Sequence, residues 1–187
     1  MRLKLKRLGC YLIIIILLPY VITVFLNGSS ITSYSHVDSA RVKVKSKDQE
    51  TEMPIEEYCI GILAKVIPAS YEKEALKAQA VLVRTEVYRK IRESGKETVL
   101  EEEFWTQKQM EDAWGNKYPK YYRNLEDAWE ETEGMALHYG EELALTPFFR
   151  LSNGCTRDGK EVLGSEEYPY LKIVDCPYDI EDEKQIR

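Results

Sequence analysis

The chain has 187 residues, a mass of 21.8 kDa and a formal net charge of −6, with 44% hydrophobic and 31% charged residues. This composition excludes a disordered chain, a collagen-like fibre and a polytopic membrane protein, and the length fits one domain or two small ones. A net negative charge gives no global attraction to phosphates, so no nucleic acid partner is expected.

The N-terminus combines a basic tip with an uncharged apolar run. Residues 1–7 hold two Arg and two Lys, whereas residues 8–26 carry no charge. At about 1.5 Å per residue, that run just covers a hydrocarbon core of roughly 30 Å. With the basic tip cytoplasmic, the pattern predicts a transmembrane signal anchor and an extracytoplasmic body, hence a single-pass membrane protein. A cleaved signal peptide is the alternative, and the length of the run and the lack of an A-x-A-like site disfavour it.

The next segment, residues 27–52, is rich in Ser, Lys, Asp and Thr and has few large apolar residues. Such a composition is typical of a solvated extracytoplasmic stalk. Val42 and Val44 alternate with basic residues, which leaves room for one short strand. The folded body is therefore expected to span residues 53–187, enough for a single core.

The first half of this body has helical patterns. Apolar residues at helical spacing predict a helix over residues 54–65, which Pro68 ends. A longer apolar stripe predicts the strongest helix over residues 71–91, with Ser70 as its N-cap and Gly95 just past its end.

The pattern changes from helical to strand-like further along. Thr106 and Gln109 have the spacing of a capping box, which predicts a helix over 106–114, and another helix is expected over 121–133. Strands are expected over 135–139, 142–149 and 169–174, the first two as a hairpin around Gly140. The predicted fold is α+β: a helical N-terminal half, then a C-terminal half rich in hairpins and strands, behind one transmembrane helix.

Residue spacing predicts neither a metal site nor a cofactor. The histidines are His36 and His138, and no Cys or His pair has zinc-ligand spacing. Outside the membrane the cysteines are Cys59, Cys155 and Cys176. An oxidising compartment would permit a disulfide, and Cys155–Cys176 is the more plausible pair.

Catalytic motifs are equally scarce. The chain has no G-x-S-x-G elbow, P-loop or dinucleotide fingerprint. A Cys–His nucleophile pair, with Cys59 or Cys155 near His138, is disfavoured but stays open. The acidic runs 101–103 and 130–131 are expected to be solvated surfaces. The residues by themselves nominate no catalytic acid.

Two blocks of sequence do carry a resemblance. The first runs from Pro54 to Thr85 and contains E-A-L-K-A-Q-A at Glu74–Ala80, followed by V-R-T. The second comprises the segments 132–140, 148–149, Ser152-Asn153-Gly154, 169–171 and 176–179. Together they resemble the stage II sporulation protein D family, which includes the amidase enhancer of cell-wall autolysis, over about residues 53 to 179.

This resemblance implies a lytic transglycosylase-like protein that acts on peptidoglycan glycan strands stripped of their peptides. In such a reaction one glutamic acid protonates the glycosidic oxygen and then activates the 6-hydroxyl of the same sugar. The family also implies a cell-wall amidase and a membrane-anchored sporulation protein as partners. Its motif residues here are Glu74, Lys77, Gln79 and Thr85.

One departure bears directly on catalysis. The catalytic glutamate of the family lies two residues before a proline, in a segment of the form A-S-E-M-P, and this chain reads A-K-V-I-P with Val66 at that position. The resemblance therefore favours a degenerate homologue that keeps a glycan groove or a partner surface without catalysis. The alternative is an active enzyme with a relocated carboxylate, for which the candidates are Glu57, Glu72 and Glu86.

Four residues are candidates for glycan binding. They are Arg84 from the first block and Ser152, Asn153 and Gly154 from the second. Polar turn residues beside a groove suit sugar hydroxyls. The competing interpretation is structural, and it is favoured for Glu74 and Arg84: the first is a good helix former, and the second could pair with a neighbouring carboxylate.

Overall fold

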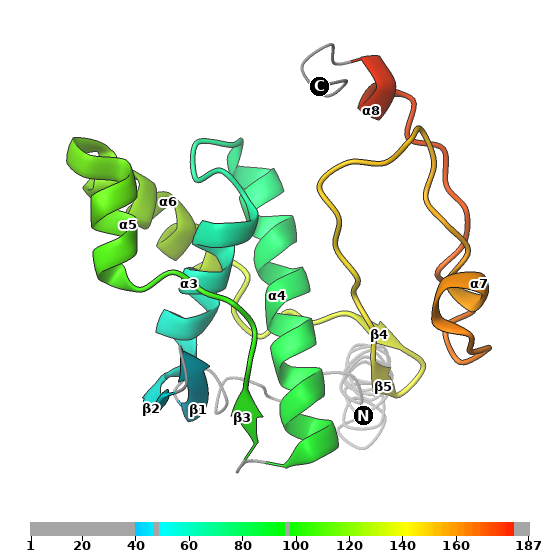
Figure 1. Ribbon diagram of the computed structural model, residues 1–187, viewed down its shortest axis with the longest axis horizontal. Coiled ribbons are helices and arrows are strands. Elements are labelled where there is room, and N and C mark those ends of the chain that lie inside the picture. The colour runs from blue at the N-terminus through cyan, green and yellow to red at the C-terminus, as the bar shows by residue number, and fades with distance from the viewer. Residues whose placement is uncertain (1–39, 47–48, 96–97, 182–187) are drawn as a thin grey trace, which may run out of the picture. The chain divides into compact units, whose positions relative to one another are not determined.

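The computed structural model describes residues 40–46, 49–95 and 98–181 (Figure 1). They belong to two compact units, one ending at Ala144 and the other beginning at Leu145. The predicted tip (1–7) and membrane anchor (8–26) lie outside the described residues. Within the described ranges, none of the helices has the length and apolar character needed to span a bilayer.

The first unit opens with a three-stranded sheet in the order β2-β1-β3. Strand β1 (Arg41–Ser46) pairs antiparallel with β2 (Gln49–Pro54) and parallel with β3 (Val99–Leu100). Val42 and Val44 are buried in the core. The folded body therefore already includes Arg41 and part of the predicted stalk 27–52, rather than starting at residue 53. The polar composition of the segment did not indicate a buried strand, because only every second residue of β1 faces the core.

Helix α3 (Ile55–Val66) is the central helix of the first unit and matches the predicted helix 54–65 within one residue. Eight of its twelve residues are buried, and it packs against α4 and α6 (Figure 1). Gly61 lets another segment cross it closely, because the Trp105 amide donates to the Gly61 carbonyl at 2.9 Å. A Cβ at Gly61 would lie 2.5 Å from the Trp105 carbonyl oxygen.

Helix α4 (Lys73–Ser94) is the long helix predicted over 71–91. Its buried residues include most of the predicted apolar stripe: Leu76, Ala80, Val83 and Val87. The N-cap position is occupied by Glu72 rather than Ser70, and no side chain caps the helix. Gly95, with φ of 86°, ends it as predicted.

The next helices follow the predicted capping box. Helix α5 (Gln107–Trp114) has Thr106 as its N-cap, and Thr106 and Gln109 form both bonds of the box. The one-turn helix η1 (Gly115–Lys117) leads into α6 (Tyr118–Glu130), which buries Leu125, Ala128 and Trp129. The predicted helix 121–133 is therefore present, with both ends about three residues earlier.

The predicted hairpin closes the first unit. It consists of β4 (His138–Tyr139) and β5 (Glu142–Leu143), shorter than expected. The second unit contains α7 (Gly159–Leu163), α8 (Tyr178–Glu181) and one isolated antiparallel bridge.

The expectation of a strand-rich C-terminal half is wrong. Residues 169–174 form no strand. The chain around them pairs with another segment at a single bridge, between Cys155 and Asp175, and one bridge does not make a strand. Gly159 is the one buried residue among the described residues of the second unit. The described fold is a mixture of helices and two small sheets.

Candidate functional site

Val66, at the position of the expected catalytic acid, is the last residue of α3. Its side chain is partly buried and packs against the core. The chain then leaves the helix through buried Ile67, and the Asn124 side chain donates to the Ala69 carbonyl at 2.9 Å. The position is thus fixed by α6 and the core, and it holds an apolar side chain where the family resemblance predicts an acid.

A carboxylate does contact the residue next to Val66. The Lys65 ammonium forms an ion pair with Glu103, which follows β3. Hydrogen bonding from Lys65, reinforced by its charge, lowers the pKa of Glu103 below its ordinary value. A general acid needs the opposite shift, because it must hold its proton at working pH. Glu103 is therefore a poor substitute for the missing glutamate.

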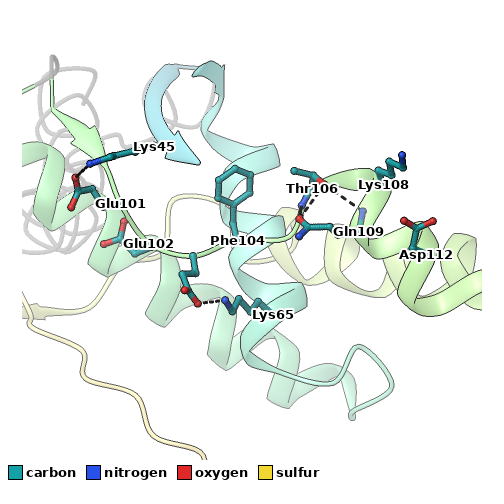
Figure 2. A pocket seen from close by; sticks show the side chains of 10 residues that line it. Lys45, Lys65, Glu101, Glu102, Phe104, Thr106, Lys108, Gln109 and Asp112 are labelled. Carbon is teal, nitrogen blue, oxygen red and sulfur yellow. Dashed lines mark hydrogen bonds and ion pairs between the residues drawn. The ribbon is translucent and has the colours of Figure 1, made fainter. Parts of the chain in front are cut away.

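A pocket of about 540 Å³ lies beside this ion pair (Figure 2). Its lining comes from β1, the end of α3, the segment after β3 and the start of α5. The lining residues are Lys45, Lys65, Glu101, Glu102, Glu103, Phe104, Thr106, Lys108, Gln109 and Asp112. Three are basic and four are acidic, so the pocket is polar and mixed in charge.

Glu102 is the least exposed carboxylate of the described ion pairs. Its side chain is 20% exposed and forms an ion pair with Lys90 of α4. The Tyr58 hydroxyl of α3 donates to its Oε2 at 2.8 Å, and burial raises the pKa of Tyr58. The expectation that residues 101–103 form a solvated surface is therefore wrong for Glu102, which links α3, α4 and the pocket.

The three glutamates considered as relocated acids lie in different places. Glu57 is in the first turn of α3, nine residues before Val66, which is about 13 Å along a helix. Glu72 is exposed at the start of α4. Glu86 is in the middle of α4 and pairs with Arg89 at 2.7 Å. None of the three lines the same space as the ion pair between Lys65 and Glu103.

Arg84 lies in the core, with 0% of its surface exposed. Its guanidinium donates to the carbonyls of Thr132 at 2.7 Å and Trp129 at 2.8 Å, and it lies 3.7 Å from the centre of the Trp129 ring. The predicted glycan contact requires a side chain at the surface, so the structure corrects this assignment to a structural role. One of its nitrogen atoms also donates to the Thr132 hydroxyl at 3.1 Å, so these contacts tie α4 to the end of α6.

The other motif residues of α4 connect it to neighbouring segments. Thr85 is buried, and its hydroxyl accepts from the Leu137 amide at 2.9 Å. Gln79 is also buried. Lys77 forms ion pairs with Glu74 at 3.1 Å and with Glu131 at 3.8 Å. Glu131 directly follows α6 and also forms an ion pair with Lys73. The motif thus holds α4, α6 and the hairpin together.

The Ser152-Asn153-Gly154 turn belongs to the second unit. The amide and hydroxyl of Ser152 donate to Asp179 Oδ2 at 2.8 and 2.6 Å, and the Gly154 amide donates to the Ser152 hydroxyl at 3.2 Å. These contacts lower the pKa of Asp179. Ser152 is thus engaged by Asp179 of α8, whereas Asn153 is exposed.

The favoured cysteine pair does not have disulfide geometry. Cys155 is opposite Asp175 in the bridge, and the Cys176 amide donates to the Gly154 carbonyl at 2.7 Å. This register puts the two cysteines one residue out of step, and so on opposite faces of the paired segments. Among the described residues, neither cysteine forms a disulfide, and buried Cys59 forms none either. The described residues also contain no group of three or more potential metal ligands.

Comparison with known proteins relates the chain to one protein family. The model of a family described as stage II sporulation protein matches residues 44–139. The chain is 31% identical over 146 residues to stage II sporulation protein D of Bacillus subtilis (strain 168), and 30% identical over 144 residues to that of Bacillus amyloliquefaciens. Each alignment covers 72% of this chain and 42% of the relative. The chain therefore spans less than half of the length of these curated relatives.

Proposed function

Because the chain belongs to the stage II sporulation protein D family, we propose that it is a sporulation-related protein that binds the cell wall without cutting it. The observation that carries this proposal is Val66 at the end of α3, in place of the expected acid. Valine has no ionisable proton and cannot act as a general acid. Loss of a general acid lowers the reaction rate about 10²–10⁴-fold.

Two carboxylates of the pocket beside α3 support the same proposal. Glu103 has a lowered pKa through its contact with Lys65. Glu102 is held by Lys90 and by the Tyr58 hydroxyl. Both are engaged in contacts that stabilise a charged carboxylate, whereas the reaction begins with a protonated one. The pocket that both residues line would therefore serve binding rather than chemistry.

The proposal extends to location and partners. Residues 8–26 would anchor the chain, so that the body lies outside the cytoplasm and meets peptidoglycan glycan strands. A cell-wall amidase and a membrane-anchored sporulation protein are the protein partners that the family resemblance implies. The buried motif residues, Arg84 and Thr85, would preserve the fold that presents these surfaces.

The second candidate function is a lytic transglycosylase with a relocated carboxylate. Its specific support is that Glu102 lines the pocket while being mostly buried. Glu57, Glu72 and Glu86 have weaker support, because none of them lines that pocket.

The two functions predict different products from glycan strands. The full chain, purified in detergent, would be incubated with peptide-free glycan strands, and anhydro-muramyl products would be sought by mass spectrometry. Val66→Glu restores the expected acid, and Val66→Gln is the matched control with the same shape and no acid. A pull-down with the same strands measures binding independently of cleavage.

We expect the unmodified chain to bind and to release no product. Product from Val66→Glu, but not from Val66→Gln, would show a groove that lacks only its acid. Product from the unmodified chain would overturn the proposal in favour of a relocated carboxylate. Failure of the folded chain to bind wall material would overturn the wall-binding function itself.

A further inference from the structure

The mixed-charge pocket has a chemistry that neutral glycan does not match. We propose that it binds a short peptide carrying both a free ammonium and a free carboxylate, as an uncrosslinked stem peptide of peptidoglycan does. The choice of a wall peptide rests on the proposed function, whereas the need for both charges rests on the pocket.

Most charges of the pocket are already paired within the protein. Lys45 pairs with Glu101, Lys65 with Glu103, and Glu102 with Lys90 of α4. Two charged side chains of the lining remain, Lys108 and Asp112. Neither has a hydrogen bond or ion pair with any other residue that the structure describes. The pocket thus presents one cation and one anion to a ligand.

The helix fixes the positions from which these two side chains project. Lys108 and Asp112 are four residues apart on α5, which places them on the same face of the helix (Figure 2). The capping box of Thr106 and Gln109 fixes the first turn, from which Lys108 projects. A ligand with a carboxylate and an ammonium a few bonds apart can form an ion pair with each side chain, whereas an uncharged sugar offers only hydrogen bonds from its hydroxyls.

Size and apolar content also fit a short peptide. The volume of about 540 Å³ is in the range of pockets for small ligands and holds a few residues rather than a long polymer. Phe104 supplies an apolar wall, its ring fixed edge-on against Tyr58 with the ring centres 5.1 Å apart. Alkyl groups of a peptide would lie against this ring.

The test measures binding of one peptide and its blocked forms to the full chain by isothermal titration calorimetry. The probe is the tripeptide L-Ala-γ-D-Glu-L-Lys. Its first blocked form has both amines acetylated, and its second has both carboxyl groups amidated. Chitotetraose is the neutral glycan control. Peptide-free glycan strands are tested in the same series by pull-down.

Two variants remove one charge each and keep the shape: Lys108→Gln and Asp112→Asn. The matched control is Lys120→Gln, an exposed lysine of α6 that does not line the pocket. We expect each pocket variant to weaken tripeptide binding about two- to fivefold, the range for exposed ion pairs, and the control to leave it unchanged. Acetylation of the peptide should remove the effect of Asp112→Asn, and amidation should remove that of Lys108→Gln.

Other outcomes overturn the inference. Equal binding of the tripeptide and its blocked forms would show that charge is not recognised. Tripeptide binding that both pocket variants leave unchanged would place the peptide elsewhere. Binding of glycan strands without binding of the tripeptide would reject this ligand while leaving the proposed wall-binding function intact. If the chain binds neither the tripeptide nor the glycan strands, both this inference and the proposed wall-binding function are rejected.

Discussion

Arg84 of α4 joins the turn after α6 through Thr132. Its Nη1 donates to the Thr132 carbonyl at 2.7 Å and to the Thr132 hydroxyl at 3.1 Å, while Nη2 donates to the Trp129 carbonyl. The last carbonyls of a helix lack partners within it, and a positive charge there is favourable. The arginine of the family motif is therefore explained here by helix capping inside the core.

Replacing Arg84 should cost stability. Arg84→Lys removes the two-pronged donor and leaves buried carbonyls unsatisfied, for which we expect a loss of about 2–4 kcal/mol in the free energy of unfolding. Denaturant titration measures this loss. The control is Arg92→Lys, because Arg92 is an exposed arginine of the same helix, with an expected loss below about 1 kcal/mol. Equal stability of the two variants, with wall binding lost only at Arg84, would contradict the structural role.

Gly61 should tolerate no side chain. Gly61→Ala places a Cβ 2.5 Å from the Trp105 carbonyl oxygen, so the segment before α5 must move away from α3. We expect a loss of about 1–3 kcal/mol, opposite in sign to the gain of about 1 kcal/mol that this exchange gives inside an exposed helix. The denaturant midpoint reports the sign. A raised denaturant midpoint would mean that residues 104–105 do not pack against α3.

Tyr58 should stabilise the fold through Glu102. Tyr58→Phe removes the hydroxyl that donates to Glu102 Oε2 at 2.8 Å and leaves this carboxylate with one partner fewer. Hydrogen bonds to charged groups contribute about 1.5–3 kcal/mol, so a loss in that range is expected on denaturant titration. Tyr71→Phe is the control, because Tyr71 is 54% exposed. Identical midpoints for the two variants would show that the contact with Glu102 contributes nothing.

Local sequence patterns predicted the helices well. The periodicity of residues 55–62 is that of α3, and the Thr106–Gln109 spacing marks the start of α5. Both signals depend on neighbours within one or two turns, which is why the sequence alone reveals them. The prediction failed where a segment needs a distant partner. The strand expected over 169–174 has β-prone residues but pairs with its neighbour at only one bridge.

The candidate site depends on distant partners even more strongly. Glu102 is held by Tyr58, 44 residues earlier, and by Lys90. The pocket combines residues from Lys45 to Asp112. A run of three glutamates is usually solvated, and nothing within the run distinguishes its middle member. The resemblance to the family located Val66, but contacts across the fold were needed to show what surrounds it.

The turn at Ser152 should open in acid. Hydrogen bonds from the Ser152 side chain, then from its amide, lower the pKa of Asp179 below its ordinary value of 3.8. A lowered pKa in the folded state means that the contact contributes stability above about pH 3.8 and loses it as the pH falls through the lower, folded-state value. We therefore expect the amide resonances of Ser152 and Gly154 to shift together in NMR spectra below pH 3.8. Asp179→Asn should abolish this step, and a step above pH 3.8 would contradict the described contact.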